Sequence, residues 1–118
     1  MILVDTSIWV DHLRSRSRTL VGLLEADQVL VHPFVIGELA CGQLANRREI
    51  LELLESLPTA ATARHEDVLA LLDTRRLYGK GIGWVDAHLL CSTLFSRAAL
   101  LTLDRPLLRV AKGLGIAA

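Results

Sequence analysis

Short apolar runs that alternate with helical segments constrain the fold of this chain more than any other feature. The runs MILVD at 1–5, QVLVH at 28–32 and AALLTLD at 98–104 are only five to seven residues long, which is the length of a buried strand. The segments between them carry the apolar spacing of helices. Strands that alternate with helices favour a parallel sheet with helices on both faces. The sequence therefore predicts an α/β fold.

The helices are predicted from their caps, their apolar spacing and their breakers. Pro33 follows the second apolar run and suits the first position of a helix. Asn46 is followed by Glu49 three residues later, which is typical of a helix start, and Pro58 ends that segment. We expect helices over 6–13, 19–26, 33–45, 46–57, 65–79, 84–97 and 105–113, a weak strand at 59–62 and a loop at 79–83.

Length and composition bound the organisation of the chain. With 118 residues and no repeat or linker, we expect one domain over 1–118. Hydrophobic residues make up 52% of the chain and the mean hydropathy is +0.41, which is apolar for so small a protein. We expect part of this surplus to lie in an interface with another subunit or partner.

The charges balance, with 13 basic and 13 acidic residues, so no overall basic field indicates nucleic-acid binding. Arginine and lysine nevertheless cluster at 14–18, 47–48 and 75–80. Each cluster alone is typical of a solvated face, and together they are compatible with a local basic rim. We expect the 14–18 cluster, which lies near the first strand, to contact a nucleic-acid backbone.

The cysteines and the lengths of the uncharged runs bear on the cellular compartment of the protein. Cys41 and Cys91 lie far apart, without a second Cys or a His at metal-ligand spacing, so we expect buried free thiols in a reducing compartment. The first residues lack the basic region of a signal peptide. The longest uncharged runs have ten residues, too few for a membrane span. We therefore expect a cytoplasmic protein with no membrane partner.

Four acids stand in apolar surroundings. Asp5 and Asp104 end the first and last apolar runs, and ligands bind beyond the carboxyl ends of parallel strands. Glu38 is the only charged residue between Asp27 and Arg47, so we expect it to point inward or along a cleft wall. Asp86 heads an apolar stripe in the first turn of its helix, where the helix dipole favours an anion.

Each acid also has an ordinary structural explanation. Asp5 could cap the next helix, Glu38 could pair with an arginine, Asp86 could match the helix dipole, and Asp104 could begin a turn. Taken singly these explanations are favoured, but four converging carboxylates without cationic partners would raise one another's pKa. A hard divalent cation such as Mg²⁺ or Mn²⁺ resolves this repulsion. Such a site suits phosphodiester hydrolysis.

The sequence resembles the PIN-domain ribonucleases, and within them the VapC-type toxins of bacterial toxin–antitoxin systems. The resemblance rests on MILVDTSIWVDHLR, IGELACG, GWVDAHLLCSTL and LLTLDRPLLRVAKGLGI, in that order along the whole chain. It implies a three-layer α/β/α sandwich on a short, mainly parallel sheet, and an endoribonuclease that depends on Mg²⁺ or Mn²⁺. The acids of the family carry onto Asp5, Glu38, Asp86 and Asp104. Thr6 matches a family hydroxyl that would orient Asp5 or a water on the metal, while its alternative role is a helix cap.

The resemblance also implies partners. It predicts an RNA substrate, tRNA or ribosomal RNA, a VapB-type antitoxin that lays a peptide across the active-site groove, and a homodimer. One departure follows Asp104, where Arg105, Pro106 and Leu107 stand and relatives often carry an aromatic residue. This departure concerns the last loop and leaves the acid in place.

Other functions fit the sequence less well. A phospho-acceptor signalling domain needs a lysine at the end of a late strand, and Lys80 and Lys112 are not so placed. An aspartyl phosphatase needs a second acid where Ser7 stands. A DNA-cleaving flap nuclease needs more chain than 118 residues. The alternative that stays open is a catalytically weak PIN-like module that binds RNA or protein.

Overall fold

A three-stranded parallel sheet lies at the centre of the fold. The computed structural model describes residues 1–118. Its strands are β1 (Ile2–Val4), β2 (Val29–Leu30) and β3 (Ala99–Leu101), in the order β2-β1-β3. Leu3 pairs with Leu30 on one side and with Leu100 on the other. Because the chain leaves β1 toward β2 while β3 lies on the opposite side, the carboxyl end of β1 is a topological switch point.

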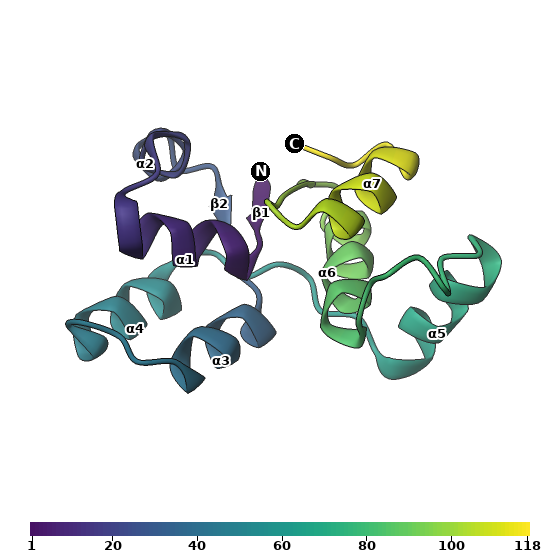
Figure 1. Cartoon of the computed structure of the whole chain (residues 1–118), viewed down its shortest axis with the longest axis horizontal. Helices are drawn as coiled ribbons and strands as arrows, with labels where there is room; N and C mark the ends of the chain where they lie inside the picture. The colour runs from purple at the N-terminus through teal and green to yellow at the C-terminus, as the bar shows by residue number, and fades with distance from the viewer.

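Seven helices surround this sheet, and Figure 1 shows α1 to α4 on one side of β1 and α5 to α7 on the other. This arrangement confirms the predicted α/β/α fold. None of the seven helices combines the length and the hydropathy that a membrane span requires. The helices are α1 (Thr6–Ser15), α2 (Arg18–Glu25), α3 (Pro33–Cys41), α4 (Arg47–Ser56), α5 (His65–Thr74), α6 (Trp84–Phe95) and α7 (Arg105–Gly113).

The core forms where the strands meet α6 and the first helix. Leu3, Leu100 and Leu89 are completely buried, and Trp9 of α1 is 1% exposed. Burial of large apolar side chains from both halves of the chain is the main stabilising contribution. It holds the carboxyl ends of β1 and β3 next to the first turn of α6.

Several predicted elements are shorter in the structure. The 33–45 helix ends at Cys41, where the Arg47 guanidinium donates to the carbonyl oxygens of Ala40 (2.8 Å) and Gly42 (3.3 Å). The predicted strand at 59–62 is reduced to one parallel bridge between Val31 and Thr59. Cys41 was expected to be buried and is exposed, because its helix ends at the surface. Cys91 is buried as predicted.

Two helix ends also differ from the prediction. The 65–79 helix ends at Thr74, because Arg76 adopts a positive φ of 53° and buried Leu77 then donates its N–H to Leu72. Asn46 was expected to cap α4 with its side chain. It adopts a left-handed conformation instead, with no side-chain cap bond.

A buried histidine caps the N-terminus of α3. His32 is 2% exposed, and its Nδ1 accepts from the Phe34 N–H at 2.9 Å. Its Nε2 lies 3.1 Å from Ser92 Oγ. Because Nδ1 is the acceptor, the neutral ring donates from Nε2. Burial, with a smaller contribution from His88, lowers the pKa of His32 to about 4.

Acidification is therefore expected to destabilise the fold through His32. The folded state favours the neutral ring, while the unfolded chain takes up a proton near pH 6.5. The stabilisation is complete above that pH and is lost as the pH falls toward about 4, a difference of about 3 kcal/mol. Denaturant unfolding across this range measures it. In a His32→Asn variant, which keeps an oxygen for the cap, this part of the pH dependence should disappear; an unchanged acid loss would contradict the assignment.

Candidate metal and phosphodiester site

The carboxyl ends of β1 and β3 are joined by a hydrogen-bond network around Asp5. Asp5 is 6% exposed, and its N–H donates to the Leu101 carbonyl oxygen at 3.0 Å. Its Oδ2 accepts from the hydroxyls of Thr102 (2.6 Å) and Ser7 (2.8 Å). The network fixes the buried Asp5 carboxyl group at the switch point of the sheet.

The two hydroxyls are themselves held by the loop after β3. Thr102 Oγ1 accepts from the Asp104 N–H, and Ser7 Oγ accepts from the Leu103 N–H, both at 3.0 Å. Each hydroxyl therefore accepts from the backbone and donates to Asp5. This network links Asp5 to Asp104 through Thr102.

Asp104 lies beyond the end of β3 rather than in it. Its Oδ2 accepts from the Leu107 N–H at 3.0 Å, so it is the N-cap of α7. Asp104 is exposed to solvent. The cap fixes the carboxylate at the start of α7 without burying it, and its other oxygen remains free of hydrogen bonds.

Asp86 lies in the first turn of α6, where the Gly83 N–H donates to its Oδ2 at 3.1 Å. Burial raises the pKa of Asp86, the Gly83 hydrogen bond opposes this, and the charges of Asp5, Asp104 and Glu38 raise it further. Those three carboxylates are therefore close enough for their charges to act on Asp86. The structure brings the four predicted acids to one edge of the fold.

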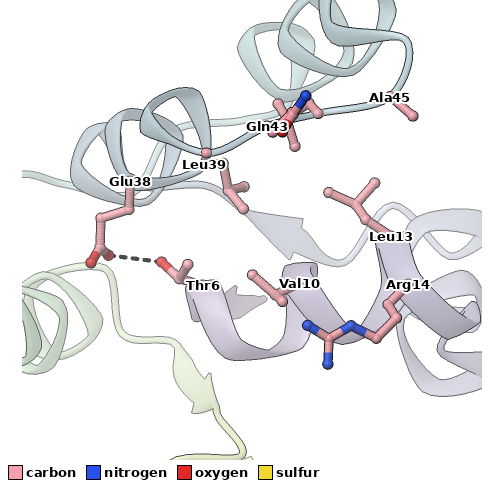
Figure 2. A pocket seen from close by; sticks show the side chains of 10 residues that line it. Thr6, Val10, Leu13, Arg14, Glu38, Leu39, Gln43 and Ala45 are labelled. Atoms are coloured by element: carbon pink, nitrogen blue, oxygen red, sulfur yellow. Dashed lines mark hydrogen bonds between the residues drawn. The ribbon is translucent and has the colours of Figure 1, made fainter.

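Glu38 faces this edge from α3. Glu38 is exposed to solvent and does not point into the core. It lines the wall of a groove, which is one of the two positions predicted. Thr6 Oγ1 donates to Glu38 Oε1 at 2.8 Å, as Figure 2 shows. Thr6 was expected to orient Asp5 or a water on the metal, or to cap the helix. Its hydroxyl contacts Glu38, and the hydroxyls on Asp5 belong to Ser7 and Thr102.

Thr102 is the site residue that the sequence analysis missed. It is the only polar side chain in the apolar run 98–103 and is 6% exposed. A lone hydroxyl in a buried strand needs a partner, and that requirement could have pointed to the acid on the neighbouring strand.

The groove beside Glu38 has a volume of about 440 Å³ and lies between α1 and α3. Figure 2 shows the Thr6–Glu38 pair at one end and Val10 and Leu13 of α1 further along. Both apolar residues are exposed, at 40% and 37%. The groove therefore runs from the carboxylates onto an apolar surface, and Arg14 also lines it.

The four acids share one arrangement that bears on metal binding. In each carboxylate one oxygen accepts hydrogen bonds from the protein and the other accepts none. None of the four forms a salt bridge, since the only ion pairs are those of Arg64. Carboxylate oxygens without cationic partners suit a hard divalent cation.

This donor set fits Mg²⁺ or Mn²⁺ better than Zn²⁺ or Ca²⁺. No three acidic, histidine or cysteine side chains stand close enough to hold an ion together, as a structural zinc site or a calcium cage would require. Mg²⁺ usually takes only one or two protein carboxylates and completes its coordination with water and substrate phosphates. Asp5 and Asp86 each have one carboxylate oxygen free of hydrogen bonds, so they are candidates for such a pair of ligands.

Comparison with known proteins agrees with this geometry. Residues 2–113 match the PIN domain family. The chain is 45% identical to the proteins named Ribonuclease VapC32 of two Mycobacterium tuberculosis strains, CDC 1551/Oshkosh and ATCC 25618/H37Rv, over 99% of this chain and 95% of each relative.

A solved structure shares the fold. FitAcB from Neisseria gonorrhoeae superposes with a TM-score of 0.65 and 22% identity, over 95% of this chain and 94% of that one. At that identity the likeness concerns the fold alone. The match over residues 2–113 and the 45% identity over nearly the full length together show that this chain belongs to the PIN domain family, as a VapC-type member.

Proposed function

We propose that this protein is a metal-dependent endoribonuclease of a toxin–antitoxin system. The observation that carries the proposal is the set of four carboxylates at the switch point, each with one free oxygen and none with a cationic partner. The 45% identity to proteins named Ribonuclease VapC32 supports RNA as the substrate.

In this proposal Asp5 and Asp86 hold Mg²⁺ or Mn²⁺, and Glu38 and Asp104 complete the site by binding waters or a second ion. The bound ion would polarise the scissile phosphate and lower the pKa of an attacking water. Thr102 and Ser7 fix the orientation of the Asp5 side chain through their hydroxyl hydrogen bonds. Thr6 holds Glu38 at the mouth of the groove, so that the acids stay around one substrate position.

We also propose two protein partners and a location. The apolar groove between α1 and α3 suits an antitoxin peptide that would block the acids, because it begins at Glu38 and continues over Val10 and Leu13. The exposed aromatic side chains Phe34 and Trp84 suit a homodimer interface. Access to tRNA or ribosomal RNA requires the cytoplasm.

Incubation of total bacterial RNA with the purified protein tests the activity. With Mg²⁺ or Mn²⁺ we expect discrete fragments, and with EDTA we expect intact RNA. Mapping of the fragment ends identifies the target. RNA that stays intact with every metal, in the presence of folded protein free of antitoxin, would contradict the proposal and favour a PIN-like binding module.

A further inference from the structure

A second hollow lies on the opposite half of the molecule from the groove. It has a volume of about 510 Å³ and is formed by residues 75–80, which follow α5, and by α7. We call it the basic hollow; the residues that matter in its lining are Arg75, Gly79, Lys80, Pro106, Arg109 and Gly113. Its three cations come from segments about thirty residues apart in the sequence.

No Asp or Glu lines the basic hollow, although the whole chain is neutral. Residues 75–83 and 105–118 contain six of the 13 basic residues and no Asp or Glu. None of the six forms a salt bridge within 4.0 Å. Uncompensated cations that converge on a concave surface create a local positive potential and favour an anionic ligand.

The loop after α5 packs against the start of α7 at the hollow. Gly81 adopts a φ of +81°, and a Cβ there would lie 3.4 Å from Pro106 Cβ. The loop therefore packs closely against the first turn of α7, which keeps Lys80 beside Arg109. Gly79 and Gly113 have open space where a Cβ would be, so a ligand can approach the backbone there.

The two segments that form the hollow also lead to two of the candidate acids. Pro106 of its lining follows Asp104 by two residues, and the loop that carries Lys80 runs on to Gly83, whose N–H donates to Asp86. A long polyanion suits both places, because the same two segments carry the cations and two of the acids.

We propose that the basic hollow binds the phosphate backbone of the RNA substrate, away from the bond that is cut. This inference rests on the proposed function, because RNA is the polyanion that the carboxylate site would process. Phosphate contacts of this kind position a nucleic acid without reading its sequence. The hollow would thus strengthen RNA binding whatever the sequence of the target.

RNA binding at several salt concentrations tests the proposal. The probe is a fluorescein-labelled oligouridylate, with Asp5→Asn as the background so that the RNA is not cut. Loss of two phosphate contacts in a Lys80→Gln/Arg109→Gln variant should reduce the slope of log K against log salt by about 1.4. The affinity of the background protein divided by that of the double variant should therefore fall about sevenfold between about 50 and about 200 mM salt.

A matched variant controls for the change in total charge. Arg64→Gln/Arg97→Gln removes two exposed cations outside the hollow and outside the three basic clusters of the sequence, and it should leave the slope unchanged. In the active chain, the hollow variant should raise KM for RNA with little change in kcat, as expected for uniform binding.

Each outcome separates the basic hollow from the nuclease proposal. RNA cleavage by the wild type, with the same salt slope in both double variants, would overturn the role of the hollow and leave the nuclease. The hollow variant could instead lose binding to a polyglutamate peptide while its salt slope for RNA stays unchanged. That result would assign the hollow to an acidic protein segment and overturn the proposal. A wild type that neither cuts nor binds RNA would overturn both.

Discussion

Replacement of Asp5 by Asn is expected to lower the single-turnover rate of RNA cleavage by about 10²- to 10³-fold at saturating Mg²⁺. Asn has the same shape and keeps an oxygen for the hydroxyls of Thr102 and Ser7, but it removes the charge that would hold the ion. The same loss is expected for Asp86→Asn. Labelled RNA with rapid quenching measures the rate.

The matched control for these variants is Asp73→Asn, an exposed acid on α5 outside the site. It should leave the rate unchanged within about twofold. The account is wrong about the acids if Asp5→Asn cleaves at nearly the wild-type rate, or if Asp73→Asn loses as much activity.

Asp86→Asn is also expected to raise the thermal unfolding temperature of the metal-free protein at neutral pH. Burial and the three other carboxylates raise the pKa of Asp86, so its ionised form is disfavoured in the fold, and above its ordinary pKa this costs stability. A neutral side chain removes that cost. Calorimetry without metal measures the effect, and a lower unfolding temperature would mean that the Asp86 charge stabilises the fold.

Thr102→Val is expected to weaken divalent-metal binding by about 10- to 100-fold, the usual effect of losing a group that orients a ligand. Valine keeps the shape of threonine but removes the 2.6 Å hydrogen bond to Asp5 and leaves the Asp104 N–H without its partner. The buried carboxylate then loses a donor, at a cost of about 1–3 kcal/mol in folding free energy. Titration with Mn²⁺ and denaturant unfolding measure the two effects.

Thr102→Ser is the control for this substitution, because serine keeps the hydroxyl and loses only a methyl group. It should bind Mn²⁺ much as the wild type does. Equal losses in the Val and Ser variants would show that packing, and not the hydrogen bond, gives Thr102 its importance.

The sequence predicted the architecture and the positions of the four candidate acids in the fold, because both depend on local pattern. The apolar runs that precede Asp5 and Asp104 lead to one edge of a parallel sheet, and this topology follows from the alternation of strands with helices. Asp86 was predicted from its place in a first turn. The helix–strand order and the positions of these acids therefore needed no knowledge of side-chain contacts.

The contacts within the site could not be predicted in the same way. Whether Thr6, Ser7 or Thr102 reaches Asp5 depends on how β1 and β3 are paired and on the path of the loop after β3. Glu38 was expected inside or along a cleft and lies on the exposed groove wall, where the Thr6 hydroxyl contacts it. The basic cluster at 75–80 was visible in the sequence, but the hollow joins it to Arg109, about thirty positions away, and no local pattern predicted that pairing.

Binding of Mn²⁺, followed by electron paramagnetic resonance, tests the central claim that these carboxylates hold a divalent cation. The wild type and Asp73→Asn should bind Mn²⁺ with the same affinity, and Asp5→Asn should bind it at least about tenfold more weakly. Mg²⁺ should compete for the site. Equal Mn²⁺ binding by all three proteins, or none by the folded wild type, would contradict the account.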